Sequence, residues 1–299
     1  MDAGELRVLL DSFALHLRGE RKSPQTVKSY TEGVRLFLAW CESANGVGQL
    51  ELDRRTVSAW VAALLDGGAE AATARSRQLA VRRFSAWLAA EGEIPADQLA
   101  HMSPPKLDVK VTPVLSDGQL RAMLAACKGP RLMDKRDEAL IRFMAETGAR
   151  AGEVLALELG DVNLAAGIAV IHRGKGGKAR TVPFGPRTAA ALDRYIRIRR
   201  HHRLASTAAL WLGQGGKGFA YYGLWSALAY RAKLAGIEGF HPHVMRHTAA
   251  DRWLTAGGSE GGLMAVAGWT RPDMLLRYTK ARAQQRAADE ARRLNLGDL

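Results

Sequence analysis

A proline-bearing segment at residues 94–114 separates two differently patterned parts of this 299-residue chain. It holds four prolines: Pro95, Pro104, Pro105 and Pro113. Proline lacks a backbone N–H and clashes with the preceding helical turn, so such a segment resists helix and stays stiff. A chain of this length commonly forms about two domains. We therefore predict one domain at 1–95, a linker at 96–111 and a second domain at 112–299.

The part before the linker shows apolar residues at helical spacing and no strand-like alternation. Two helix starts are marked, because Ser23 stands before Pro24 and Asp53 precedes the third stretch. Four helices are expected, at residues 4–18, 24–43, 53–65 and 70–90. Together they predict a compact helical domain.

The second part mixes helices with two short strands. A capping box at Ser116–Gln119 marks its first helix, and Gly148 is placed to end the next helix in a left-handed cap. The apolar stretches 168–171 and 181–184 predict strands around a turn rich in glycine and lysine. Helices are expected at 116–126, 134–147, 186–203, 220–235, 242–256, 259–266, 272–280 and 281–294. The chain is thus predicted to be mainly α, with a small β-sheet in its second domain.

The charge of the chain points to its partner. Lysine and arginine number 43 against 30 aspartates and glutamates, a formal net charge of +13. Such a surplus favours a polyanionic partner, and nucleic acid above all, because arginine binds phosphate through directed hydrogen bonds. Composition alone leaves open a basic protein of some other function.

The two cysteines, Cys41 and Cys127, fall in different predicted domains. They form neither a metal-ligand pair nor a disulfide framework, which fits a reducing cytoplasm. The N-terminus lacks a basic segment followed by an apolar run, and no stretch approaches the roughly 20 apolar residues of a membrane span. We therefore expect a cytoplasmic protein, which a DNA partner would place at the nucleoid.

Five pieces of the second part, in a fixed order, carry side chains suited to phosphate chemistry. They are Arg150 in Thr-Gly-Ala-Arg-Ala-Gly-Glu, Lys175 in Arg-Gly-Lys-Gly-Gly-Lys, His243-Val-Met-Arg246-His247, Gly268-Trp269, and Tyr278 in Leu-Leu-Arg-Tyr-Thr-Lys. A phosphoryl group in transfer carries spread negative charge, and guanidinium forks match its oxygens two at a time. Tyrosine can form a covalent intermediate once a base takes its proton. The set predicts phosphodiester cleavage without a metal or other cofactor.

In order, spacing and flanking residues, this set resembles the tyrosine recombinase (phage integrase) family, closest in layout to the Xer type. The resemblance covers nearly the whole chain and implies a helical core-binding domain plus an α+β catalytic domain, which clamp duplex DNA. It implies a site-specific recombinase that acts through a 3′-phosphotyrosine and a Holliday junction, in Xer-like recombination or in integration and excision of a mobile element. Family members act as tetramers on two DNA sites.

The resemblance also implies a role for each residue. Arg150 and Arg246 would hold the non-bridging phosphate oxygens, and His243 would assist proton movement. Glu153 lies three residues after Arg150, on the same helix face, and can orient the basic cluster. A surface Arg–Glu pair is the alternative at this position. His247 is expected to pack away from His243, since it lies one residue further round the helix than Arg246.

Lys175 is expected to protonate the leaving oxygen, as the lysine of the family's Gly-Lys-Gly turn does. Lys178 and Arg180 are the competing candidates, and both are expected to contact DNA. A solvated turn lysine is the alternative for Lys175. Tyr278 would attack the scissile phosphate. Three tyrosines precede His243 and so do not match the family's order: Tyr221, Tyr222 and Tyr230.

Trp269 departs from the commonest family pattern, which has a second histidine after the glycine. Indole donates one hydrogen bond but cannot exchange a proton. We therefore expect Trp269 to contact a phosphate oxygen without acid–base work, or else to be a buried core residue.

Three nearby histidines, His241, His243 and His247, raise the question of zinc. No cysteine, aspartate or glutamate accompanies them at a recognisable ligand spacing. We therefore predict no metal site.

Basic residues also gather in the first domain. Six of them are expected to contact the DNA backbone, which positions a protein without reading sequence: Lys22, Lys28, Arg75, Arg77, Arg82 and Arg83. The stretches Ser23–Thr26 and Thr73–Arg75 resemble the family's core-binding domain. An ordinary solvated face is the alternative.

The residues after Tyr278 form a small-residue face on a polar, basic tail. Four of its members recur at helical spacing, and Ala288 lies beside them: Ala283, Ala287, Ala291 and Leu294. In the family such a tail docks into the neighbouring subunit; packing on its own domain is the alternative.

Two other functions share features of this sequence, a type IB topoisomerase-like strand relaxase and a non-catalytic DNA-binding factor such as a directionality factor or repressor.

Overall fold

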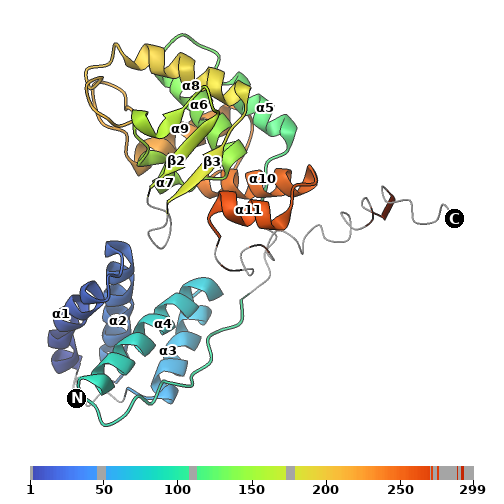
Figure 1. Cartoon of the computed structure of the whole chain (residues 1–299). Helices are drawn as coiled ribbons and strands as arrows, with labels where there is room; N and C mark the ends of the chain where they lie inside the picture. The colour runs from blue at the N-terminus through green and yellow to red at the C-terminus, as the bar shows by residue number, and fades with distance from the viewer. Residues whose placement is uncertain are drawn as a thin grey trace. The chain divides into compact units, whose positions relative to one another are not determined.

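The structure is a computed structural model that describes residues 3–45, 52–107, 113–172 and 179–269, together with residues 271, 275, 288, 291 and 292. The chain folds into two compact units, residues 1–110 and 111–299 (Figure 1). Each unit has its own hydrophobic core.

The first unit is built from four helices, as predicted. They are α1 (Ala3–Gly19), α2 (Pro24–Asn45), α3 (Arg54–Asp66) and α4 (Ala71–Ala90). Asp53 caps α3 as expected, because its Oδ1 accepts a 2.7 Å hydrogen bond from the Thr56 N–H. The α2 helix packs on α1 and α4. Gly33 allows α2 to approach α4 closely, since a Cβ on this residue would lie 2.6 Å from the Cβ of Ala80. Phe13 and Phe84 pack edge to face in the core, with their ring centroids 5.2 Å apart.

The segment after α4 is fastened to this unit along residues 97–103. Leu99 is fully buried in the helical core. Ser85 Oγ donates a 2.6 Å hydrogen bond to Asp97, Gln78 donates to the Ser103 carbonyl, and Arg82 donates to the Ala100 carbonyl. The first half of the segment predicted as a linker, 96–111, therefore lies against the helices.

The second unit combines seven helices with a small sheet in the described residues (Figure 1). The helices are α5 (Asp117–Ala125), α6 (Leu132–Thr147), α7 (Ala151–Leu155), α8 (Pro186–Arg199), α9 (Tyr221–Leu234), α10 (Pro242–Thr255) and α11 (Glu260–Ala267). The predicted capping box at Ser116 is present. None of the helices in the described residues of either unit is long and apolar enough to cross a membrane.

The sheet is antiparallel, in the order β1 (Val162–Asn163), β2 (Ile168–Ile171) and β3 (Arg180–Pro183). The two predicted strands are present, and β3 begins one residue earlier than expected. Ile171 pairs with Arg180 at the base of the β2–β3 hairpin. The two-residue strand β1 and a 3₁₀ turn at Leu159–Asp161 were not predicted, since elements this short carry no periodic pattern.

The α8 helix ends at Arg199 rather than continuing to residue 203 as predicted. Arg199 is 2% exposed, and its guanidinium donates hydrogen bonds to carbonyls of the chain that follows: those of Ala205, Thr207, Ala209 and Leu210. These bonds satisfy carbonyls of an irregular segment, so they favour the turn over further helix.

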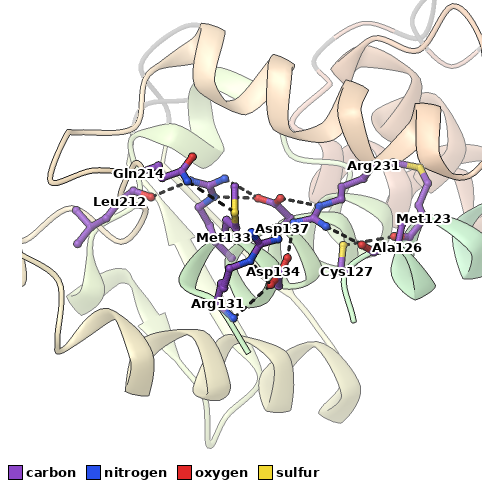
Figure 2. Close-up of polar contacts among 11 residues, drawn as sticks. Met123, Ala126, Cys127, Arg131, Met133, Asp134, Asp137, Leu212, Gln214 and Arg231 are labelled. Carbon is purple, nitrogen blue, oxygen red and sulfur yellow. Dashed lines mark hydrogen bonds and ion pairs between the residues drawn. The ribbon is translucent and has the colours of Figure 1, made fainter. Parts of the chain in front are cut away.

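A buried ionic network ties α5, α6 and α9 together (Figure 2). Arg231 donates to Asp137 and Asp134, each at 2.9 Å, and to the Ala126 carbonyl at 2.6 Å. Arg136 binds the other oxygen of Asp137 and the Leu212 carbonyl. Burial opposes ionisation of Asp134, but hydrogen bonds from Arg231 and Arg131 outweigh it, so the pKa of Asp134 is lowered.

Candidate active site

Arg150 lies at a sharp turn between two helices. Gly148 ends α6 in the left-handed conformation predicted for it, with φ 61°. Arg150 precedes the first residue of α7, and its backbone N–H donates a 2.9 Å hydrogen bond to Glu153 Oε2. Its Nη1 donates to Glu153 Oε1 at 2.8 Å. The Arg150 side chain keeps a quarter of its surface exposed, so it can reach a ligand from this position.

Arg246 connects two of the predicted pieces. It lies on α10, three residues after His243, and is 2% exposed. Its Nη1 donates a 2.7 Å hydrogen bond to the Gly148 carbonyl, and its Nη2 donates a 2.8 Å bond to the Ala267 carbonyl. Arg246 therefore joins the turn before Arg150 to the end of α11.

The ring of Trp269 lies against the guanidinium group of Arg246. Gly268 ends α11 in the left-handed conformation, with φ 64°, and turns the chain so that Trp269 follows. The Arg246 guanidinium carbon lies 5.2 Å from the centroid of the indole, a distance at which a cation is attracted to the ring face. Trp269 is 5% exposed and packs with Leu263 and Leu275, so it contributes to a small core as well as to the site.

Arg180 and Glu153 form a buried bidentate pair. The Arg180 Nη1 and Nη2 atoms donate to the two carboxylate oxygens of Glu153 at 3.1 and 2.7 Å. Burial alone raises the pKa of Glu153, but hydrogen bonds from Arg180 and the Arg150 backbone, with the Arg180 charge, hold it below its ordinary value. Glu153 is therefore ionised at neutral pH and can orient both arginines.

The two histidines of α10 contact each other. Their ring centroids are 4.5 Å apart and the rings are perpendicular. His243 is exposed, whereas His247 is 8% exposed. The expectation that His247 packs away from His243 is wrong, because residues four apart are as close on a helix as residues three apart. His247 therefore packs against the ring of His243, which is expected to assist proton movement.

Three of the predicted site residues lie outside the described residues: Lys175, Lys178 and Tyr278. In the sequence, Lys175 falls between the paired ends of β2 and β3, at Ile171 and Arg180. Leu275, which precedes Tyr278 by three residues, is buried against the cluster that includes Trp269. Among the residues that are described, no three His, Cys, Asp or Glu side chains group as metal ligands do.

The basic residues of the first unit differ in how they are placed. Lys28, Arg75 and Arg83 are exposed, and Arg77 is half-buried. Lys22 lies 3.4 Å from Glu20, an ion pair at the surface. Arg82 uses Nη2 to hold the Ala100 carbonyl, so it contributes to the packing of the segment after α4. This last contact could not be inferred from helical spacing.

Comparisons with known proteins identify the family. Residues 113–285 match the model of the phage integrase family, and residues 10–92 match that of the phage integrase N-terminal SAM-like domain. The chain belongs to the phage integrase family. Its class of enzyme is that of the tyrosine recombinases, which cut and rejoin DNA, and neither a topoisomerase nor a non-catalytic factor is favoured.

Curated relatives are similar over most of their length. The tyrosine recombinase XerC of Azotobacter vinelandii is 31% identical over 251 residues, which cover 82% of each chain. The tyrosine recombinase XerD of Ralstonia nicotianae is 30% identical over 235 residues, 78% of this chain and 76% of the relative.

Solved structures share the fold. XerH site-specific recombinase, bound to a palindromic difH substrate, aligns with a TM-score of 0.73 at 17% identity, over 95% of this chain and 84% of that one. The Tn1549 transposon integrase, in complex with transposon right end DNA, also aligns with a TM-score of 0.73 at 17% identity, over 98% and 99% of the two chains. The predicted fold, mainly helical with a small sheet, is confirmed.

Proposed function

We propose that this protein recombines specific DNA sites through a covalent protein–DNA intermediate. The observation that carries the proposal is the direct connection between the pieces: Arg246 binds the turn before Arg150 and the carbonyl before Gly268-Trp269. Residues nearly a hundred positions apart in sequence thus meet around one point. Arginines on the connected segments, Arg150 and Arg246, suit a phosphodiester, whose oxygens guanidinium groups match in pairs.

Tyr278 is the nucleophile of the proposed reaction. Its phenolic oxygen bonds to phosphorus, the bond from phosphorus to the 5′-oxygen breaks, and a 3′-phosphotyrosine remains. His243 assists removal of the phenolic proton, and Lys175 gives a proton to the leaving 5′-oxygen. The ester keeps the bond energy, so the 5′-hydroxyl of a partner strand can reverse the step without ATP.

Arg150 and Arg246 stabilise the charge of the transition state in this proposal. Donors fixed in advance at a partly buried site act more strongly than donors in water. Trp269 fixes the Arg246 guanidinium by its ring and contacts a phosphate oxygen through its indole N–H. A metal ion is not needed, because the arginines and Lys175 meet the charge that it would otherwise balance.

Duplex DNA is the proposed partner, and the surplus of positive charge supports it. Exposed cations of the first unit, Lys28, Arg75 and Arg83, contact the phosphate backbone, with Lys22, Arg77 and Arg82 beside them. Lys178 adds a contact from the hairpin turn. We place the protein in the cytoplasm at the nucleoid, and we propose that four copies act on two DNA sites, with the tail after Tyr278 docking in the neighbouring copy.

Covalent capture tests the proposal and finds the site at once. Purified protein is incubated with fragmented DNA of its host, detergent-resistant protein–DNA adducts are recovered, and the attached ends are sequenced. We expect adducts at a small set of sequences. Tyr278→Phe should bind the same DNA and form none, whereas Tyr230→Phe, which changes an exposed tyrosine of α9, should match the wild type. An adduct that persists in Tyr278→Phe, or maps to Tyr221, Tyr222 or Tyr230, contradicts the assignment.

A further inference from the structure

We propose that Arg180 is a positioning residue of the cleavage site, which fastens Glu153, and through it Arg150, to the C-terminal end of α11, just before Trp269. This inference rests on the proposed function, since it takes Arg150 and Trp269 as groups that meet the scissile phosphate. Arg180 was expected from the sequence to contact DNA; its surroundings in the fold point to a different role.

The first contact of Arg180 is with the carboxylate that orients Arg150. Both Nη atoms of Arg180 bind Glu153, and Glu153 Oε1 also accepts from Arg150 Nη1 at 2.8 Å. Glu153 thus lies between two guanidinium groups. A carboxylate held by a rigid fork presents its remaining lone pairs in a fixed direction, so the direction of Arg150 depends on Arg180.

The second contact is with the C-terminus of α11. Arg180 Nε donates a 2.8 Å hydrogen bond to the Val266 carbonyl. A cation is favoured at this end of a helix, where unpaired carbonyls gather. The Arg180 guanidinium also lies against Gly268, since a Cβ on that residue would be 3.1 Å from three of its atoms. Gly268 is therefore favoured twice, by its φ of 64° and by the close approach of Arg180.

The third link is through the chain itself. Arg180 is the first residue of β3, and its backbone pairs with Ile171 of β2. Lys175 falls in the sequence between these two residues, so the side chain of Arg180 anchors one end of the segment that carries the proposed general acid. One guanidinium therefore connects the pieces that contain Arg150, Lys175 and Trp269.

A role for Arg180 in holding DNA conflicts with this arrangement. Its side chain is 11% exposed, and each of its three nitrogen atoms donates within the protein. To reach a phosphate it would have to leave Glu153, whose side chain is 5% exposed. Breaking this buried ion pair would destabilise the fold, although Arg150 would still bind Glu153.

The test compares Arg180→Gln and Arg180→Lys with a control, Arg197→Gln. Arg197 lies on α8 of the same unit, in an exposed ion pair with Asp193 at 3.1 Å. Three quantities are measured for each protein: affinity for a mixed-sequence duplex at several salt concentrations, the single-turnover cleavage rate at a saturating concentration of the captured site, and hydrogen exchange of peptides covering 150–155 and 263–269.

We expect Arg180→Gln to cleave about 100-fold more slowly, because a small misplacement of the groups around the reacting phosphate costs that much. Its affinity for DNA and the salt dependence of that affinity should match the wild type, and both peptides should exchange faster. Arg180→Lys should recover part of the rate, since lysine keeps the charge beside Glu153 but cannot serve three acceptors in a plane. Arg197→Gln should resemble the wild type in every measurement.

Three results overturn the inference. One is a cleavage rate equal to that of the wild type. Another is a salt slope of binding reduced by about 0.9, the loss of one phosphate contact. The third is slower cleavage without faster exchange in both peptides. If thermal unfolding shows that Arg180→Gln is not folded at the assay temperature, Arg180→Lys decides. If the wild type forms no adduct, the proposed function fails, and the exchange data still decide whether Arg180 holds the two segments together.

Discussion

Arg246 donates a 2.7 Å hydrogen bond to the carbonyl oxygen of Gly148, two residues before Arg150. This bond joins the α10 helix to the turn that ends α6, and the second bond of Arg246, to Ala267, joins both to the end of α11. A single buried side chain therefore connects the turn that precedes Arg150 with the end of α11. Its structural and chemical roles are coupled.

Arg246→Lys should accordingly impair both cleavage and stability. Lysine is a point charge that cannot reproduce the planar fork, so we expect cleavage at saturating DNA to fall by roughly 100-fold to 1,000-fold. One of the two carbonyls would lose its donor, at a cost of about 1–3 kcal/mol in the free energy of unfolding. Single-turnover cleavage and urea unfolding measure the two effects.

Arg252→Lys is the matched control for this change. Arg252 lies on the same helix, but its side chain is 46% exposed and its ion pair with Asp117 is at the surface. It should lose little in either measurement. If Arg246→Lys cleaves as fast as Arg252→Lys, then Arg246 does not hold the reacting phosphate.

Much of the fold could be predicted because capping residues mark the ends of helices and apolar residues recur along them at helical spacing. Asp53, Ser116 and Gly148 were recognised as caps, and their geometry bears this out. The irregular chain after Arg199 could not be predicted, since it depends on one buried guanidinium that donates to four carbonyls of the non-helical residues that follow. No local pattern encodes such a contact.

In the candidate site, too, some features could be predicted from the sequence and others could not. Order along the chain brought Arg150, Arg246 and Trp269 into one hypothesis, and the fold brings Arg246 into contact with Trp269 and with the Gly148 carbonyl, two residues before Arg150. The inward direction of Arg180 was missed because β3 was predicted to begin at Thr181. With Arg180 included, alternation places it on the same face as Val182, which is fully buried. That shift of one residue was the available signal.

We predict that cleavage continues in excess chelator. The charge of the phosphate is met by Arg150, Arg246 and Lys175, none of which needs a metal ion to act. Formation of the covalent adduct at the captured site should therefore proceed at an unchanged rate in the presence of EDTA or a zinc-selective chelator. An arginine-based account is wrong if chelator abolishes the adduct and added zinc or magnesium restores it.

We predict that the tail after Tyr278 couples the copies of the enzyme. Its small-residue face, at Ala283, Ala287, Ala288 and Ala291, is not required for cleavage chemistry. Deleting the chain from Ala283 onward should spare DNA binding by single copies and weaken synapsis and strand exchange, which gel mobility and a two-site recombination assay measure. Recombination at the full rate would exclude the coupling role, and a truncated protein that unfolds at ordinary temperature would favour packing on its own domain.

Glu153 makes stability depend on pH in one direction. Its pKa is lower in the folded protein than in the unfolded chain, so it contributes stability that is fully present above its ordinary value of 4.5. That contribution is lost as the pH falls through the folded-state pKa. We expect the free energy of unfolding of the wild type to decrease more steeply below about pH 4.5 than that of Glu153→Gln. Parallel urea titrations between pH 3 and pH 7 would detect this; equal slopes would mean that the pair with Arg180 is not maintained in solution.

The buried network around Arg231 should contribute to stability only as long as it is complete (Figure 2). Arg231→Met removes the shared partner of Asp134 and Asp137, whose side chains are 3% and 2% exposed. A buried ion pair that loses one member typically costs about 3–5 kcal/mol. Arg131 still binds Asp134 and Arg136 still binds Asp137, so we expect a loss near the lower end of that range.

The matched control is Arg197→Met, in which the ion pair that is lost is exposed, with side chains 62% and 49% accessible. We expect a change of less than about 1 kcal/mol there. Unfolding in urea at pH 7 gives both values. Since the network lies at the start of α6 and Arg150 follows the end of that helix, a folded Arg231→Met protein should cleave DNA at nearly the wild-type rate. A folded variant that is fully stable yet inactive would contradict this prediction. It would mean that the network acts in cleavage rather than in stabilising the fold.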